Sequence, residues 1–182
     1  AIVGMGYGRG AYAQQAGVTP PGALSQANTS TVEITGPGTF TTQDGFSVDT
    51  TVTGGSDGNG ITITTPSVET ADTVFNDQNA SPITGEENGI YADNQGTGAL
   101  RITTSGVIDG QGSDGIYARN ENSSGSGDLS ITANGTVTGG SNPGHSAIDA
   151  KNNATGNLTV SAVTVNGSGG GFCLRARNNN GG

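Results

Sequence analysis

The stretch Gly89–Ser141 reads GIYADNQGTGALRITTSGVIDGQGSDGIYARNENSSGSGDLSITANGTVTGGS, and it decides the fold because its elements recur along the chain. The first element is an aliphatic residue followed by x-Ala-x-Asn, where x varies. It occurs four times, at Ile90–Asn94, Ile116–Asn120, Ile148–Asn152 and Leu174–Asn178. The Ala residues of these copies are spaced by 26, 32 and 26 residues. Self-similarity at such a period indicates a repeat architecture.

Two further elements follow each of the first three copies. One begins with an aliphatic-x-aliphatic triplet, and its copies start at Leu100, Leu129 and Leu158. The other is centred on an aliphatic residue shortly before a Gly, and its copies contain Ile108, Val137 and Val165. Alternation of apolar and polar residues is typical of strands with one buried face. Each unit therefore contains three short strands separated by Gly, Asn and Ser.

A single unit has too few aliphatic residues to form a core of its own, so the units must stack on one another. Strands this short leave no room for the crossover helices that parallel sheets usually need. A chain that coils back after every three strands solves both problems. The sequence therefore predicts an all-β parallel β-helix of about six coils, each of roughly 26 residues, from about residue 29 onward. We interpret the 32-residue interval as a loop insertion at 139–145.

Composition and charge exclude several other classes. Gly, Thr, Ser and Asn make up half of the 182 residues, and the formal net charge is −9 with one Lys, Lys151. No apolar run is long enough for a transmembrane helix, and helix formers are too scarce for a helical bundle. The sequence has no basic stripe of the kind that nucleic-acid binders carry. Disorder is the alternative, but the charge is dilute and the aliphatic residues are regularly placed.

The N-terminal region differs from the repeats. Ala11-Tyr12-Ala13 has the small-x-small form of a signal-peptidase site, so residues 1–13 read as the end of a signal peptide or as a flexible arm. Residues 14–28 read as a flexible lead-in, and residues 29–182 as the β-helix, which we expect to continue beyond the fragment. A single cysteine, Cys173, provides no disulfide framework, and we expect it to be an inert packing residue.

Stacking makes specific predictions about equivalent residues. The asparagines that end the first element are expected to form a structural ladder in which each amide bonds the next coil, at a turn position where Asn tolerates a left-handed conformation. These are Asn94, Asn120, Asn152 and Asn178. Tyr91 and Tyr117 are expected to stack on the outer face. Asp149 and Arg175 are expected to form a surface ion pair worth less than about 1 kcal/mol.

The run Gly89–Ser141, with its GIYA(R/D)N, (D/A)LxIT and G(T/V)(V/I)xG elements, resembles the passenger repeats of bacterial autotransporters. The resemblance is good over about residues 85–182 and loose over 29–84. It implies a right-handed β-helix that is secreted and displayed at the bacterial cell surface. There a C-terminal outer-membrane β-barrel in the parent chain would hold it. It also implies that the chain acts as an adhesin or as a scaffold.

The sequence supports an enzymatic function less well than a binding function, and we expect no catalytic residues. The segment Gly106–Gly112 resembles part of the polygalacturonase family, but that family needs a paired Asp-Asp and this chain has none. Asp109 and Asp114 are more simply explained as turn residues. His145 is the single histidine, and no nucleophile motif lies near it. The Gly-rich run 54–60 lacks the Lys of a phosphate loop and the tandem copies of a calcium repeat, so no cofactor or metal is predicted.

Binding through loops and the outer face is therefore the predicted function, with a host matrix protein or a glycan as the ligand. The candidate contact residues lie in two loops: Asn122, Ser123, Ser141, Asn142 and His145. The main alternative is a passive stalk that holds another module away from the cell. We also expect that the open ends of the solenoid favour self-association.

Overall fold

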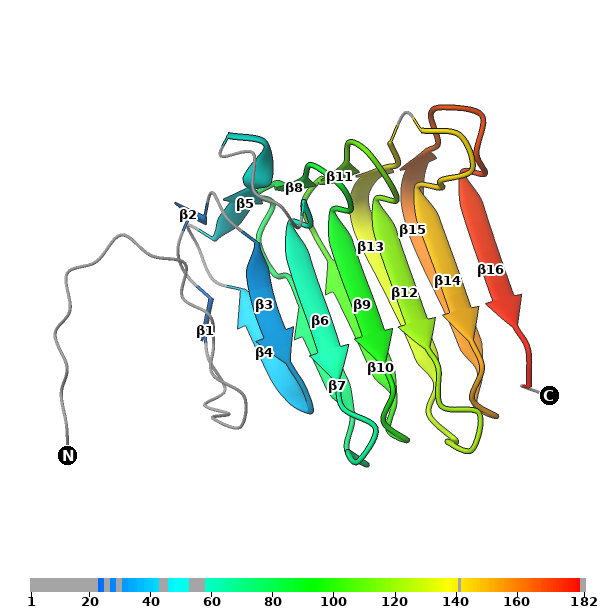
Figure 1. Cartoon of the computed structure of the whole chain (residues 1–182). Coiled ribbons are helices and arrows are strands. Elements are labelled where there is room, and N and C mark those ends of the chain that lie inside the picture. Colours follow the sequence, from blue (N-terminus) through cyan, green and yellow to red (C-terminus); the bar gives the residue numbers. More distant parts are fainter. Residues whose placement is uncertain are drawn as a thin grey trace, which may run out of the picture.

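The computed structural model describes residues 23–24, 27–28, 31–42, 46–52, 58–140 and 142–180. These residues form a β-solenoid in which every strand pair is parallel (Figure 1). The prediction of an all-β parallel β-helix is confirmed. The described part contains five complete turns rather than about six, preceded by two short strands and followed by the first strand of another turn.

One face of the solenoid is a six-stranded sheet, which lies in front in Figure 1. Its strands are β3 (Val32–Thr35), β6 (Ile61–Thr65), β9 (Ile90–Asn94), β12 (Ile116–Asn120), β14 (Ile148–Asn152) and β16 (Leu174–Asn178). The register pairs each aliphatic-x-Ala-x-Asn element residue for residue with the next one. The alignment of the first repeat element is thus confirmed.

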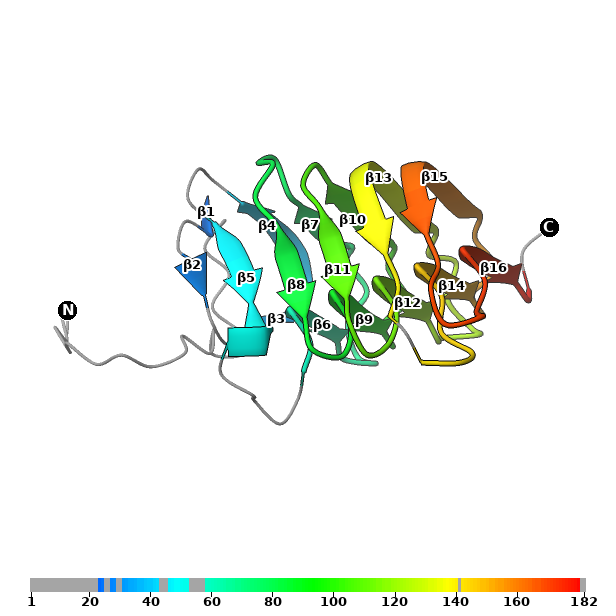
Figure 2. The same cartoon turned by 90° about the horizontal axis from the view of Figure 1, so that it is seen from above.

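The other two faces belong to one ten-stranded sheet (Figure 2). Its second-face strands are β1 (Ala23–Leu24), β4 (Gly38–Thr42), β7 (Thr73–Asn76) and β10 (Leu100–Thr104). Its third-face strands are β2 (Ala27–Asn28), β5 (Ser47–Asp49), β8 (Ile83–Gly85) and β11 (Ile108–Gly110). The long strands β13 (Leu129–Thr138) and β15 (Leu158–Asn166) cover both faces.

The expectation of three separate strands holds for the turns up to β11 and is wrong for the next two. Between β10 and β11 the chain leaves the sheet, and the buried carboxylate of Asp77 accepts the N–H groups of Ser105 and Gly106. In β13 and β15 the strand instead continues around the corner, with a register shift between Ala133 and Thr136. A shift of this kind is a β-bulge, which bends a strand without ending it.

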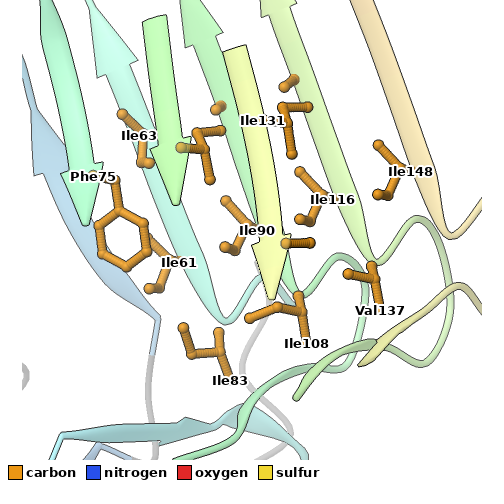
Figure 3. Packing of buried hydrophobic residues seen from close by; sticks show 14 of the residues in the cluster. Ile61, Ile63, Phe75, Ile83, Ile90, Ile108, Ile116, Ile131, Val137 and Ile148 are labelled. Carbon is orange, nitrogen blue, oxygen red and sulfur yellow. The ribbon is translucent and has the colours of Figure 1, made fainter. Parts of the chain in front are cut away.

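The core is a set of columns of aliphatic side chains, one residue from each turn. Ile61, Ile90, Ile116 and Ile148 stack along the axis, and all are fully buried (Figure 3). A second column, Ile83, Ile108 and Val137, comes from the third face. Each side chain is covered by its equivalents in the turns before and after it, so no turn is stable without its neighbours.

The extra length of the 32-residue interval is divided between two loops. Asn94 and Leu100 are six positions apart, whereas their register partners Asn120 and Leu129 are nine apart. The remaining three extra residues lie between β13 and β14. The expectation of a single insertion at 139–145 is therefore wrong. Half of the added length is in the loop after β12.

Residues 1–13, interpreted as the end of a signal peptide or an arm, lie outside the described residues. Within the segment interpreted as a lead-in, β1 and β2 pair with β4 and β5 and extend the sheet by two short strands. The one helical element in the described ranges is the short 3-10 helix η1 (Thr50–Val52). No helix of the described part is both long enough and apolar enough to cross a membrane.

Candidate functional site

The outer face of the six-stranded sheet presents two columns of side chains. Alternation along each strand sends the second and fourth residues of every repeat element outward. The first column, read from β3 to β16, is Glu33, Thr62, Tyr91, Tyr117, Asp149 and Arg175. The second column is Thr35, Thr64, Asp93, Arg119, Lys151 and Arg177.

Two tyrosines form the centre of the first column. The rings of Tyr91 and Tyr117 are stacked, with centroids 5.1 Å apart and an angle of 4° between the ring planes, so the predicted stack is confirmed. The guanidinium of Arg119 lies 3.8 Å from the centroid of the Tyr117 ring. Tyr117 therefore combines an aromatic contact with a cation–π contact. Burial, and then the charge of Asp93, raise the pKa of Tyr91.

Asp149 continues this column, and it is not the surface residue that we expected. Its side chain is fully buried although it lies on the outward side of the sheet. The Arg119 guanidinium donates two hydrogen bonds to the Asp149 carboxylate, from Nη1 to Oδ1 at 3.0 Å and from Nη2 to Oδ2 at 2.9 Å. On the other side, Arg175 Nε donates to Oδ2 at 2.9 Å. Three cations enclose this carboxylate, because Arg177 Nη2 also lies 3.6 Å from Oδ1.

The protonation equilibria follow from these contacts. Burial alone would raise the pKa of Asp149, but the hydrogen bonds and charges of Arg119 and Arg175 lower it. Burial would likewise lower the pKa of Arg119, and Asp149 raises it. The hydrogen bond to Asp149 raises the pKa of Arg175. Asp149, Arg119 and Arg175 therefore carry their full charge at neutral pH.

We call Arg119, Lys151, Arg175 and Arg177 the basic cluster. It gathers four of the six Lys and Arg residues of a strongly acidic chain onto three adjacent strands. Asp149 and Glu121, whose carboxylate lies 3.6 Å from Lys151 Nζ, offset two of its charges. The cluster as a whole therefore has an excess of two positive charges, and its most exposed cations are Arg175 and Arg177, whose side chains are 33% and 46% exposed.

Reasoning from the sequence missed this cluster, because Arg119, Lys151 and the pair Arg175/Arg177 are 24 to 32 residues apart along the chain and form no basic run. The signal was present in the repeats. The fourth residue of the aliphatic-x-Ala-x-Asn element reads Asp, Arg, Lys and Arg in the four copies. Reading the repeats down their columns, rather than along the chain, would have placed three cations side by side.

The predicted contact loops are not brought together. The loop with Asn122 and Ser123 follows the end of β12, whereas the loop with Asn142 and His145 precedes the start of β14. Because β12 and β14 are parallel and in register, the two loops lie at opposite ends of the sheet, about 16 Å apart for a five-residue strand. They cannot contact one small ligand together. Ser141 lies outside the described residues.

Each of the two loops is hydrogen-bonded to the preceding turn of the solenoid. Asn122 Nδ2 donates to the Gln95 carbonyl at 3.1 Å, while Ser123 is exposed. Asn142 is exposed, and its Nδ2 donates to the Gly112 carbonyl at 2.6 Å. These bonds fix the loops as part of the solenoid, and they leave Ser123 and the backbone around Asn142 accessible to a ligand.

His145 lies near a buried carboxylate. Its Nδ1 is 3.5 Å from Oδ2 of the buried Asp114, whose Oδ1 accepts the N–H of Ser146. The hydroxyl of Ser146 is the nearest in sequence, but the residue is fully buried. Asp114 therefore anchors the loop before β14. A substrate cannot reach the Ser146 hydroxyl in this arrangement.

The four asparagines of the predicted ladder occupy equivalent positions, and the first three are buried. A bond from Asn94 Nδ2 to Asn120 Oδ1 at 3.0 Å joins two of them directly. Their amides mainly close the following loop, as Asn120 Nδ2 does on the Gly127 carbonyl at 2.9 Å and Asn152 Nδ2 on the Gly156 carbonyl at 2.9 Å. Asn178 Nδ2 donates to the Gly156 carbonyl of the turn before.

These asparagines do not use the left-handed conformation that Asn tolerates, because glycines alone have positive φ among the described residues. Two other single residues differ from a simple packing role. Cys173 is exposed, contrary to the expectation of a packed residue. Asp109 is half-buried on β11, and burial raises the pKa of its carboxyl group. The described residues contain no group of three or more His, Cys, Asp or Glu side chains placed to hold a metal ion.

The outer face of the six-stranded sheet is thus an extended, pre-formed surface that is suited to binding a ligand. It offers stacked aromatic rings, a row of fixed cations and two fastened loops on one rigid scaffold. Comparisons of the chain with protein-family models, with curated proteins and with solved structures give no match.

Proposed function

We propose that this chain is a β-helical passenger segment of an autotransporter-type protein, secreted and displayed on the bacterial cell surface, where it acts as an adhesin or scaffold. The repeat elements of Gly89–Ser141 support this origin through their resemblance to passenger repeats. The ligand is a host matrix protein or a glycan, bound by the outer face of the six-stranded sheet and by its loops.

One observation carries the binding role: the basic cluster and the tyrosine stack share one outer face. Ion pairs with Asp149 and Glu121 give two of these four cations a structural role, and the excess of two positive charges in a chain of net charge −9 is left for a ligand. Long side chains held by ion pairs lose little conformational freedom when a ligand binds, which favours affinity. Such a surface is suited to acidic groups that lie along the solenoid axis.

The test compares three proteins on immobilised collagen and on a panel of neutral and acidic glycans. The proteins are the unaltered chain, the double variant Lys151→Gln/Arg177→Gln, and the matched control Arg101→Gln. Arg101 is also a cation on a strand, but it lies in β10 on another face. We expect the double variant to bind at least about tenfold more weakly, a loss of about 1.4 kcal/mol, and the control to bind normally.

Equal binding by all three proteins would indicate that the ligand contacts the loops instead. A Ser123→Arg variant would then test the loop after β12, because the larger charged side chain would interfere with a ligand bound there. Absence of binding to every surface would favour the passive stalk. That alternative is supported by the register of the repeats, which makes the solenoid a stiff rod of stacked turns.

A further inference from the structure

Tyr91 uses only one face of its ring in the stack with Tyr117. The Tyr117 ring is contacted by Tyr91 and by the guanidinium of Arg119, which continues toward β14. The two rings are nearly parallel and lie about one strand spacing apart, so the second face of Tyr91 is turned toward β6. No ring or cation of the described residues contacts that face. The stack is therefore open inside the sheet, with β6 and β3 lying beyond it (Figure 1).

The residue next to Tyr91 in the same column has a short side chain. Thr62 on β6 is the register partner of Tyr91, and its hydroxyl accepts a hydrogen bond from Asn59 Nδ2 at 3.1 Å. Glu33 on β3 is in turn the register partner of Thr62, and it is exposed. Tyr91 and Glu33 are therefore two strand spacings, about 10 Å, apart along the axis, with only a threonine side chain between them.

The charge around Thr62 is negative. The outward residues of β3, β6 and β9 include two carboxylates, Glu33 and Asp93, and no cation. Every Lys and Arg among the described residues is paired with another carboxylate, and neither of these two takes part in such a pair. Asp93 Oδ2 accepts a hydrogen bond from Gln95 Nε2 at 3.0 Å, while its Oδ1 has no hydrogen-bond partner. A cation is therefore attracted to this part of the face.

The protein itself shows which cation fits a tyrosine face on this sheet. The guanidinium carbon of Arg119 lies 3.8 Å from the Tyr117 ring centroid, and its nitrogens donate to the Asp149 carboxylate. The order along the axis is thus carboxylate, guanidinium, ring, ring. A second guanidinium on the open face of Tyr91, followed by the carboxylate of Glu33, would repeat this order in reverse. At 3.8 Å from the ring it would leave about 6 Å, within which the flexible Glu33 side chain can reach a hydrogen-bond distance of about 2.9 Å.

We infer that the open face of Tyr91, beside Thr62, binds an arginine side chain of a partner protein, with its guanidinium stacked on the ring and hydrogen-bonded to Glu33. A guanidinium fits better than an ammonium because it is planar, stacks on aromatic rings and donates two parallel hydrogen bonds to a carboxylate. A neutral sugar ring would make no use of the excess negative charge. The site is separate from the basic cluster, and the inference does not rest on what that cluster binds.

The experiment titrates the unaltered chain, carrying ¹³C-labelled tyrosine rings, with Nα-acetyl-L-argininamide. The matched control compound is Nα-acetyl-L-citrullinamide, which has the same shape but an uncharged urea group in place of the guanidinium. A Tyr91→Phe variant identifies the NMR signals of the Tyr91 ring. We expect a saturable shift of these signals, with an affinity for the arginine compound at least about fivefold higher than for the citrulline compound. Equal affinities, or no shift of the Tyr91 signals, would overturn the inference.

Protein variants locate the contact. Thr62→Arg supplies a guanidinium from the protein itself beside Tyr91, so it is expected to abolish binding of the arginine compound. Glu33→Gln is expected to weaken binding at least about threefold, whereas Glu86→Gln, which removes another exposed carboxylate in the loop after β8, should leave it unchanged.

Unchanged binding by either Thr62→Arg or Glu33→Gln would mean that the compound binds elsewhere, and it would overturn the inference. Binding that appears only in an Arg9→Gln variant would identify this chain's own Arg9, which lies outside the described residues, as the occupant. That result would also overturn the assignment to a partner protein.

Discussion

Arg119 and Asp149 are 30 residues apart in the chain, yet they form a two-pronged ion pair that is almost completely removed from solvent. The pair joins the outer faces of β12 and β14, two turns of the solenoid. A buried carboxylate of this kind is tolerated because its oxygens are hydrogen-bonded and its charge is compensated. The neighbouring Arg175 extends the same arrangement to β16.

Removing this carboxylate should be strongly destabilising. In Asp149→Asn the guanidinium of Arg119 remains buried without a counter-charge, and Arg175 and Arg177 repel it. We expect the free energy of unfolding in urea to fall by about 3 kcal/mol. The control is Asp128→Asn, which removes the charge of a half-exposed carboxylate 3.9 Å from Arg101 and should cost less than about 1 kcal/mol. Similar losses in the two variants would contradict the assignment of Asp149 as a buried, shared counter-ion.

The same carboxylate makes stability depend on acid. The pKa of Asp149 is lower in the folded protein than in the unfolded chain, so the folded state binds this proton more weakly. Its stabilising contribution is therefore complete above the unfolded value of about 3.9 and is lost as the pH falls below it. Urea unfolding between pH 6 and pH 3 should show a smaller loss for Asp149→Asn than for the unaltered chain. Parallel curves would argue against the ion pair as the cause.

The stacked tyrosines make a separate contribution. Tyr117→Ala removes both the ring contact with Tyr91 and the cation–π contact with Arg119, and we expect a loss of about 1–2 kcal/mol. Tyr117→Phe retains the ring and should change the free energy of unfolding by less than about 0.5 kcal/mol. A large loss in the Phe variant would indicate that the hydroxyl group, rather than the stack, stabilises this face.

The repeats predicted the fold because their spacing is a direct consequence of stacking. Ile90, Ile116 and Ile148 must be covered by their equivalents, so aliphatic residues recur once per turn at the same place in the element. The tyrosine stack followed from the same equivalence. Residues that obey the repeat are therefore predictable from the sequence.

Departures from the repeat were not predictable in the same way. The burial of Asp149 depends on cations supplied by two different neighbouring turns. The period of the repeats does not predict which way the long Arg side chains fold over the surface of the sheet. The Asn94 and Asn120 amides bond loop carbonyls whose positions depend on the length of each loop. The division of the extra residues between two loops, by contrast, follows from the spacing of the repeat elements, which is six residues from Asn94 to Leu100 and nine from Asn120 to Leu129.

The asparagines at equivalent positions should nevertheless contribute different amounts to the free energy of unfolding. Asn120 is fully buried, accepts a bond from Asn94 and donates one to the Gly127 carbonyl. Asn120→Ala leaves the carbonyl of Gly127 without this partner, so we expect a loss of about 1–3 kcal/mol. Asn178 holds the equivalent position in β16 but is exposed, and Asn178→Ala should cost less. Urea unfolding of both variants measures the difference, and a larger cost at Asn178 would contradict it.

Asp109 is expected to show the opposite dependence on pH from Asp149. Burial raises the pKa of its carboxyl group, and the hydrogen bond with Gln111 only partly offsets this effect. The folded state therefore binds this proton more tightly than the unfolded chain, so the favourable contribution is complete below about pH 3.9 and is lost as the pH rises through the folded pKa. At neutral pH the ionised carboxylate is a cost that Asp109→Asn removes. We expect the variant to be more stable than the unaltered chain at pH 7 and to lose this advantage at pH 3. A variant that is less stable at pH 7 would mean that the carboxylate at this position has a favourable partner, and the turn of β11 would then be the place to seek it.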